Sequence, residues 1–214
     1  MRDFDQSLPK DLLHTVQEGV FRTVYRGVPF LKSPFDIALY LQLLGRLQPR
    51  TVIEIGAKHG GSALWFADMM TVHGVSAPRV VSVDIELIAK FTDPRITFIQ
   101  GDAADLEQAL PASLLDACER PFLVVEDSSH LYKHCLAVLN FFHTRLQAGD
   151  YIIVEDGVLS HFADGRYAKL QDGPNRAVKE FLDARPESYE LDLSLCDHFG
   201  HNVTYNPNGW LRRL

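Results

Sequence analysis

The 214-residue sequence has no long apolar run, few cysteines and no excess of basic residues. No stretch approaches the roughly 18–20 apolar residues of a membrane-spanning helix, so we expect no membrane association. The opening segment MRDFDQSLPK lacks the apolar core of a signal peptide. The 21 basic residues are outnumbered by 28 acidic ones. This balance argues against a general nucleic-acid binder, because such proteins are usually basic.

The three cysteines are Cys118, Cys135 and Cys196, an odd number at wide spacing. They predict reduced thiols in a cytoplasmic protein. The sequence is 46% apolar and 23% charged, which is typical of a globular protein and excludes a disordered chain or a disulfide scaffold. The length and the absence of repeats predict one domain with an N-terminal extension: a lead-in over residues 1–33 and a main domain over residues 34–214.

Strand-like and helix-like segments alternate along the main domain. Short apolar runs predict five strands: Thr51–Gly56, Val80–Asp84, Ile96–Gln100, Phe122–Glu126 and Tyr151–Glu155. Helical spacing of apolar residues predicts four helices: Pro34–Leu47, Gly60–Met70, Leu131–Leu146 and Pro174–Leu182. Further strand-like pieces follow Tyr189. Near-continuous apolar strands that alternate with helices indicate a buried, largely parallel sheet, so the predicted fold class is α/β, doubly wound.

A glycine-rich loop follows the first predicted strand and leads into a helix. It contains Glu54, Gly56, Gly60, Gly61 and Ser62. A P-loop would require lysine after the last glycine, and a dinucleotide-binding loop would require glycine at the position of Lys58. The remaining interpretations are the looser E-x-G-x-x-x-G-G loop of S-adenosylmethionine (SAM) enzymes and a turn that binds no ligand.

Acidic residues also follow the next two strands, at the strand ends where α/β proteins bind ligands. Asp84 ends the second strand and is placed to accept hydrogen bonds from both ribose hydroxyls of a nucleoside. Gly101 and Asp102 follow the third strand and would lie near the adenine. Together with the glycine loop, these residues favour SAM binding over an empty turn.

A second acidic group, Asp127, Glu155 and Asp156, follows the fourth and fifth strands. If those strands are neighbours, about 4.8 Å apart, the three carboxylates converge. Carboxylates that close disfavour ionisation unless a cation lies between them, and their hard oxygens suit Mg²⁺, Mn²⁺ or Ca²⁺ better than Zn²⁺. On residue type and spacing alone, two simpler roles remain open: Asp127 could cap the next helix, and Asp156 could belong to a turn.

His130 lies three residues after Asp127, where it is either a general base or a partner of the helix terminus. His130 and His134 have the spacing of a zinc pair, but HLYKH lacks the glutamate of the zinc-protease motif. With Asp127 the two histidines could nominally form an Fe(II) facial triad.

Several motifs occur in order from about Tyr25 to Leu214: Arg26-Gly27, Lys32–Asp36, Glu54–Ser62, Asp127–His130, Val154–Gly157, Gly173-Pro174 with Ala177–Leu182, and Asn208–Leu214. In this order the sequence resembles the cephalosporin hydroxylase family, which is related to the macrolide-sugar and rhamnosyl O-methyltransferases. Ser129 and Glu126 depart from the residues that are common in that family.

The resemblance implies a class I methyltransferase fold with a mostly parallel, seven-stranded sheet and SAM as cofactor. It implies a Mg²⁺ (or Mn²⁺) ion held by Asp127, Glu155 and Asp156, with His130 as general base, and assembly into a homo-oligomer. We therefore expect a SAM-dependent, Mg²⁺-assisted O-methyltransferase that acts on a hydroxyl of a small molecule: a sugar, a phenol or another natural-product alcohol. The alternatives are a non-catalytic SAM-binding partner subunit and an Fe(II)-dependent hydroxylase. Residues 1–33 and Leu159–Asp172 are expected to cover the pocket.

Overall fold

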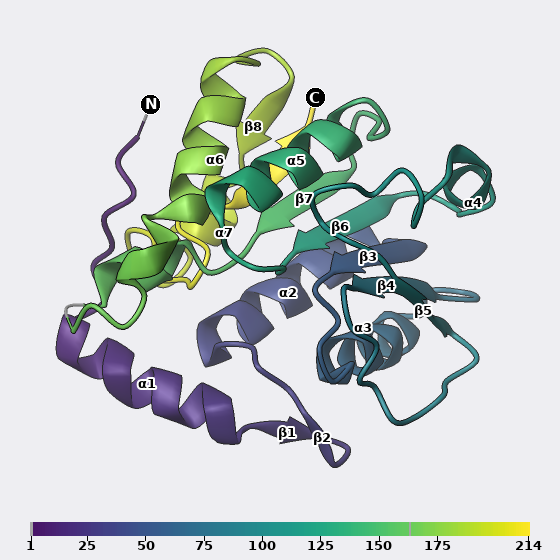
Figure 1. The fold of residues 1–214 in the computed structure, drawn as a ribbon, viewed down its shortest axis with the longest axis horizontal. Coiled ribbons are helices and arrows are strands. Elements are labelled where there is room, and N and C mark those ends of the chain that lie inside the picture. The colour runs from purple at the N-terminus through teal and green to yellow at the C-terminus, as the bar shows by residue number, and fades with distance from the viewer. Residues whose placement is uncertain (1, 163) are drawn as a thin grey trace.

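A seven-stranded sheet forms the centre of the computed structural model, which describes residues 2–162 and 164–214 (Figure 1). The strand order is β5-β4-β3-β6-β7-β9-β8. The first five of these strands are parallel, and β9 is antiparallel to both of its neighbours. The strands are β3 (Thr51–Ile55), β4 (Arg79–Asp84), β5 (Ile96–Gln100), β6 (Phe122–Glu126), β7 (Tyr151–Val154), β8 (Tyr189–Leu191) and β9 (Trp210–Arg213).

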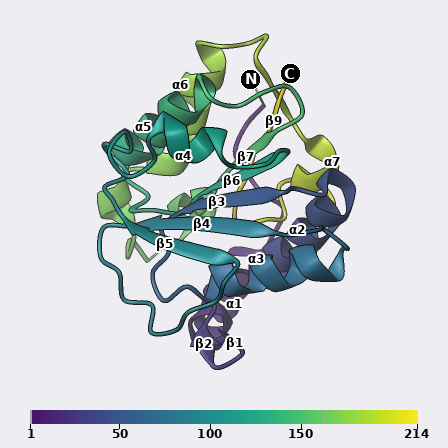
Figure 2. The same cartoon turned by 90° about the vertical axis from the view of Figure 1, so that its right-hand side faces the viewer.

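Helices cover both faces of this sheet (Figure 2). One face carries α2 (Pro34–Leu47), α3 (Gly61–Val72) and α7 (Leu193–Cys196), and the other carries α4 (Ala112–Asp116), α5 (Tyr132–His143) and α6 (Gly173–Asp183). The predicted doubly wound α/β fold class is therefore confirmed. Within the described ranges, no helix is both long and apolar enough to span a bilayer.

Successive residues of the central strands enter opposite halves of the core. In β3, Ile53 packs on the side of α5 and α6, whereas Val52 packs on the side of α2 and α3. This division explains the unbroken apolar runs in the sequence, because both faces of each strand are buried. The largest fully buried side chains include Trp210 and Phe66, and burial of each such side chain stabilises the fold by about 1.5–3 kcal/mol.

The predicted helices and strands agree with the observed ones to within a few residues. The bounds of α2 and β6 are as predicted, whereas α5 ends at His143 rather than at Leu146. The helix α2 begins where predicted because Ser33 accepts a hydrogen bond from the backbone N–H of Asp36 and Pro34 occupies the first turn. Elements that were not predicted include α1 (Lys10–Arg22), α4, α7 and the hairpin β1 (Val24–Tyr25) to β2 (Val28–Pro29).

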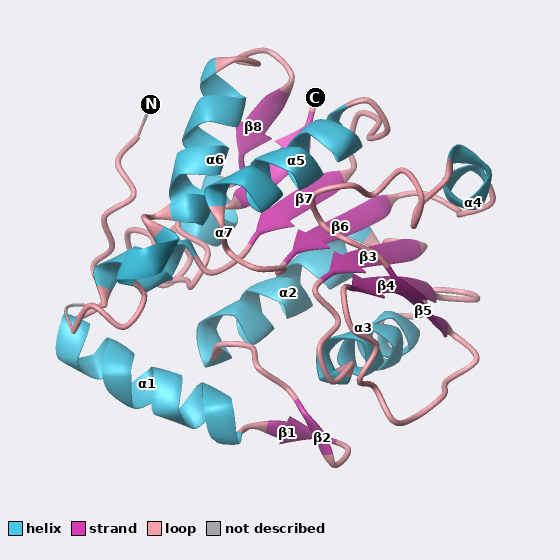
Figure 3. Cartoon of the chain, viewed as in Figure 1, coloured by secondary structure: helices cyan, strands magenta, loops and turns pink. Residues whose placement is uncertain are grey.

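The N-terminal lead-in packs against the rest of the chain. In α1, Leu13 and Val20 join a buried cluster with Val158, Leu159 and Phe162 from the segment that follows β7. The hairpin turns at Arg26-Gly27, both with positive φ, and the Tyr25 hydroxyl donates to Asp68 on α3 at 2.8 Å. These contacts bring α1 close to the carboxyl ends of the parallel strands (Figure 3).

Candidate active site

A cavity of about 550 Å³ opens at the carboxyl ends of the parallel strands, a volume typical of small-molecule sites. Most of the predicted site residues line it: Gly56, Gly61, Ser62, Asp84, Gly101, Asp102, Asp127, His130 and Asp156. Three predicted site residues are not part of its lining: Glu54, Gly60 and Glu155. The lead-in and the segment after β7 also contribute to the wall, through Gln17, Phe21, Tyr167 and Leu170 among others.

The glycine loop brings three segments of backbone into close contact. A Cβ atom on Gly56 would lie 2.0 Å from the carbonyl oxygen of Asp127, and the φ of Gly56 is +109°. A Cβ atom on Gly61 would lie 2.1 Å from the carbonyl oxygen of Pro29 in the hairpin. Only glycine fits at these two positions. The loop therefore fixes the end of β6 and the hairpin β1–β2 around the cavity.

Backbone donors hold Asp84 and Asp102 at the side of the cavity formed by β4 and β5. Asp84 accepts hydrogen bonds from the N–H of Lys58 at 2.7 Å and of Glu86 at 3.1 Å. Asp102 accepts one from the N–H of Ala104 at 2.8 Å. Each oxygen can accept further hydrogen bonds, so both side chains are fixed in positions suited to a polar ligand.

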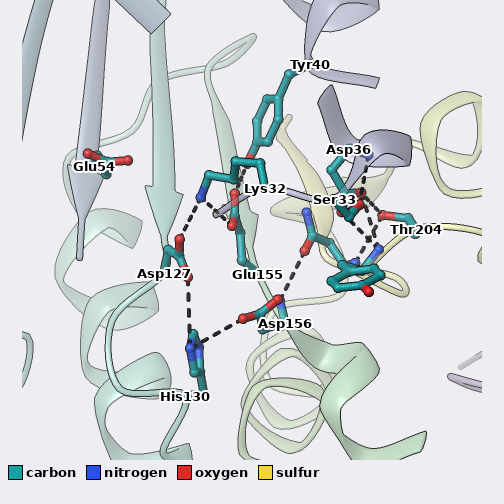
Figure 4. Close-up of polar contacts among 12 residues, drawn as sticks. Lys32, Ser33, Asp36, Tyr40, Glu54, Asp127, His130, Glu155, Asp156 and Thr204 are labelled. Carbon is teal, nitrogen blue, oxygen red and sulfur yellow. Dashed lines mark hydrogen bonds and ion pairs between the residues drawn. The ribbon is translucent and has the colours of Figure 1, made fainter. Parts of the chain in front are cut away.

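Glu54 is buried and does not form part of the cavity wall. Its side chain is fully buried, accepts a hydrogen bond from the Ser82 hydroxyl and lies apart from the other carboxylates in Figure 4. Burial raises the pKa of Glu54, although the Lys32 ammonium and the hydroxyls of Ser62 and Ser82 oppose that rise. Glu54 is thus held in the interior by Ser82 on the neighbouring strand β4.

The second acidic group assembles at the ends of β6 and β7, which are neighbours in the sheet. Asp127, His130 and Asp156 each offer one ligand atom, and these atoms lie within 4.8 Å of one another. The Nε2 atom of His130 is 3.4 Å from Asp156 Oδ2 and 4.0 Å from Asp127 Oδ1 (Figure 4). The helix α5 is preceded by Leu131 and has no side-chain cap, so Asp127 does not serve as its N-cap.

Glu155, the third carboxylate of the predicted metal site, points away from this cluster. Its Oε2 atom accepts a hydrogen bond from Lys32 at 2.5 Å, and its Oε1 atom accepts one from the Tyr40 hydroxyl at 2.5 Å. Lys32 also donates to Asp127 Oδ2 at 2.6 Å. Lys32 was not predicted as a site residue, because its partners lie far along the chain.

Burial and charge pull the pKa values of this group in opposite directions. Burial alone would lower the pKa of Lys32, but the charges of Asp127 and Glu155 outweigh it and raise that pKa above its usual value. Burial raises the pKa of Glu155 to about 7, although Lys32 opposes the rise. Burial also raises the pKa of Asp127 and of Asp156. A nearby cation stabilises the ionised form of carboxylates whose pKa is raised by burial. The oxygens of Asp127 and Asp156 therefore fit a hard divalent ion.

The nominal Fe(II) triad is not assembled in the described part of the chain. His134 lies outside the cluster, and its Nδ1 atom is 2.6 Å from the Ser129 hydroxyl. One histidine and two carboxylates remain, whereas the triad requires two histidines and one carboxylate.

Comparison with known proteins identifies the family of this chain. The family model described as "Rhamnosyl O-methyltransferase/CmcI" matches residues 18–214. The chain belongs to this family. It is 33% identical over 200 residues to a rhamnosyl O-methyltransferase of Mycobacterium bovis (strain BCG / Pasteur 1173P2), covering 90% of this chain and 78% of that protein. It is 34% identical over 198 residues to the Mycobacterium leprae enzyme of the same name, covering 89% and 83%.

A solved structure of CmcI with Mg and SAM resembles this chain with a TM-score of 0.68 and 26% identity, over 91% of this chain and 77% of the other. These matches confirm the predicted family resemblance, and the chain is an O-methyltransferase by family membership. The expectation of SAM and Mg²⁺ agrees with the complex solved for CmcI.

Proposed function

We propose that this chain transfers the methyl group of SAM to a hydroxyl of a small, sugar-containing acceptor, with Mg²⁺ bound at the acidic cluster. The observation that carries the proposal is the common cavity: the glycine loop with Asp84 lines one side, and Asp127, His130 and Asp156 line the other. The sugar is inferred from the rhamnosyl O-methyltransferases among the relatives.

The β4–β5 side of the cavity would hold SAM. Asp84 would accept hydrogen bonds from the ribose hydroxyls, and Gly101 and Asp102 would lie beside the adenine. Close packing of Gly56 and Gly61 against the backbone of Asp127 and Pro29 would keep the loop next to the end of β6 and the hairpin. This arrangement would present the methyl group of SAM toward the ends of β6 and β7.

Asp127 and Asp156 would hold the Mg²⁺ ion. The ion, when bound, supplies positive charge that lowers the pKa of an acceptor hydroxyl. Glu155 would act indirectly, because its contacts with Lys32 and Tyr40 place the ammonium of Lys32 against Asp127 and so fix the orientation of that carboxylate.

His130 would take the acceptor proton at Nε2. The acceptor oxygen would then bond to the methyl carbon while the carbon–sulfur bond of SAM breaks, leaving S-adenosylhomocysteine. The carboxylates of Asp127 and Asp156 beside Nε2 would stabilise the imidazolium that results. Positioning of the two reactants in line contributes much of the rate in such a transfer.

The experiment is a methyl-transfer assay with SAM, Mg²⁺ and a panel of simple glycosides, beginning with phenyl α-L-rhamnopyranoside. We expect His130→Ala to lower kcat by about 10²–10⁴-fold, while the dissociation constant of SAM stays near that of the wild type. His134→Ala is the matched control, since it removes an imidazole from the same cavity, and it should change kcat by less than about threefold. If the two variants lower kcat equally, His130 is not the general base.

The role of the metal is tested separately with Asp127→Asn, assayed with Mg²⁺ and with a chelator. We expect the variant to lose Mg²⁺-dependent turnover and to retain SAM binding. SAM binding by the wild type without transfer to any acceptor would instead favour a non-catalytic partner subunit. The homo-oligomer implied by the resemblance stays a prediction, which light scattering of the purified protein tests.

A further inference from the structure

Two buried polar atoms on the cavity wall have no hydrogen-bond partner among the described residues. One is the hydroxyl of Tyr205, a residue that is 3% exposed, and the other is Oε1 of Gln17, which is 6% exposed. Both residues line the cavity. Buried polar groups are nearly always hydrogen-bonded, so unpaired polar atoms in two side chains that line one cavity point to a ligand group that pairs with them.

Tyr167 connects the two. The Nε2 atom of Gln17 donates to the Tyr167 hydroxyl at 3.4 Å, and Tyr167 also lines the cavity. The three residues come from three separate segments: α1, the segment that follows β7, and the segment that precedes β9. Val20 of α1 and Phe162 belong to the same buried cluster as Tyr205, with Tyr167 packed against it. The three polar side chains therefore share one continuous wall.

This wall lies on the acceptor side of the cavity. Asp84 and Asp102 follow β4 and β5, which lie on one side of β3, whereas Asp156 follows β7 on the opposite side of the strand order. The charge of Asp156 reaches the hydroxyls of both Tyr167 and Tyr205 and contributes to the raised pKa of each, after burial. These two tyrosines therefore lie in the electrostatic environment of Asp156, on the side of the cavity where β7 ends.

The chemistry of the unpaired atoms defines the group they would bind. The carbonyl oxygen of Gln17 can only accept a hydrogen bond, and the hydroxyl of Tyr205 has a proton to donate. A ligand hydroxyl matches the chemistry of both, because it can donate to the first and accept from the second. A keto or ether oxygen could pair with Tyr205 alone.

We propose that Gln17, Tyr167 and Tyr205 form a subsite that recognises a free hydroxyl of the acceptor next to the hydroxyl that is methylated. The subsite rests on the proposed function and narrows its substrate class to acceptors with at least two neighbouring hydroxyls, such as an unprotected sugar ring.

The test compares Tyr205→Phe and Gln17→Leu with the wild type in methyl transfer to phenyl α-L-rhamnopyranoside and to its monodeoxy analogues. We expect each variant to raise the KM of the rhamnoside by about three- to tenfold, as for the loss of one hydrogen bond, with a smaller effect on kcat. The dissociation constant of SAM should stay within about twofold of the wild-type value. Each variant should also lose most of the preference for the rhamnoside over one particular deoxy analogue.

Tyr189→Phe is the matched control. The Tyr189 hydroxyl is likewise buried and unpaired among the described residues, but Tyr189 does not line the cavity. This variant should keep the wild-type KM and selectivity. If Tyr205→Phe weakens transfer to the rhamnoside and to every deoxy analogue by the same factor, the tyrosine binds no acceptor hydroxyl and the subsite is refuted. A wild-type protein that methylates none of these glycosides contradicts the proposed function itself, and the subsite with it.

Discussion

The ammonium of Lys32 lies 2.5 Å from Oε2 of Glu155 in the interior of the protein. It also lies 2.6 Å from Oδ2 of Asp127, so one buried cation joins the carboxylates that follow two neighbouring strands. Lys32 immediately precedes the Ser33 cap of α2. This contact therefore ties the lead-in to the strand ends and fixes the orientation of Asp127.

Lys32→Met should destabilise the fold strongly. The substitution leaves the buried Glu155 and the partly buried Asp127 without their cation, and loss of a buried partner typically costs about 3–5 kcal/mol of unfolding free energy. Urea unfolding at pH 7 in a chelator measures the loss. Lys179→Met is the control, since Lys179 forms an exposed pair with Asp183 one helical turn away and should cost less than about 0.5 kcal/mol. Losses of similar size in the two variants would show that the buried contact contributes little.

Gly56→Ala should disturb both the fold and SAM binding. The backbone at position 56 has a positive φ, which alanine rarely adopts. The new Cβ atom would also lie 2.0 Å from the carbonyl oxygen of Asp127, so the loop and the end of β6 must separate. We expect a loss of about 1–3 kcal/mol in unfolding free energy and a clear rise in the dissociation constant of SAM.

Gly19→Ala provides the contrast for that substitution. Gly19 lies within α1, and its added Cβ atom would meet nothing within 4 Å. This variant should therefore gain about 0.5–1 kcal/mol of unfolding free energy. Calorimetric unfolding measures both changes. A Gly56→Ala protein with wild-type stability and SAM affinity would contradict the close approach of the loop to Asp127.

Asp36 should make stability depend on pH. Burial raises the pKa of Asp36 from 3.8 to about 7, although the hydroxyls of Ser33 and Thr204 oppose the rise. Between about pH 4 and pH 7 the folded protein keeps this proton while the unfolded chain releases it, so the contribution of Asp36 to stability falls as the pH rises.

Asp36→Asn removes that titration. The unfolding free energy of the wild type, minus that of the variant, should therefore decrease between pH 4 and pH 7, by at most about 4 kcal/mol for a shift of this size. Urea unfolding at several pH values measures the difference. A difference that is constant over this range would mean that the folded protein carries Asp36 ionised throughout.

The central strands could be predicted because both of their faces are buried, which gives apolar runs that need no knowledge of partners. The helix α1 was not predicted, although Leu13, Val16 and Val20 follow one another at helical spacing. Gln17 interrupts this buried stripe, and the exposed Leu12 and Phe21 place apolar residues outside it. The position of α1 depends on residues after β7 that lie far away in the sequence.

The sequence predicts which residue types gather at the ends of the strands, but not how their side chains are oriented. Glu155 and Asp156 follow the last residue of β7, and the backbone of Asp156 is left-handed, with a φ of 63°. Of the two, only Asp156 lines the cavity. Nothing in the local sequence indicates which one does. The contacts of Lys32 span 95 and 123 residues, so no local pattern identifies that lysine as the partner of the buried glutamate.

The most direct test of the assignment of this cavity is a calorimetric titration of SAM into the wild-type protein after removal of co-purified ligand, with NAD as a control ligand. We predict saturable binding of SAM at one site, weaker binding in Asp84→Asn, and no binding of NAD. A folded protein that shows no heat of SAM binding at several temperatures would contradict the assignment, and the acidic cluster would then serve a different chemistry.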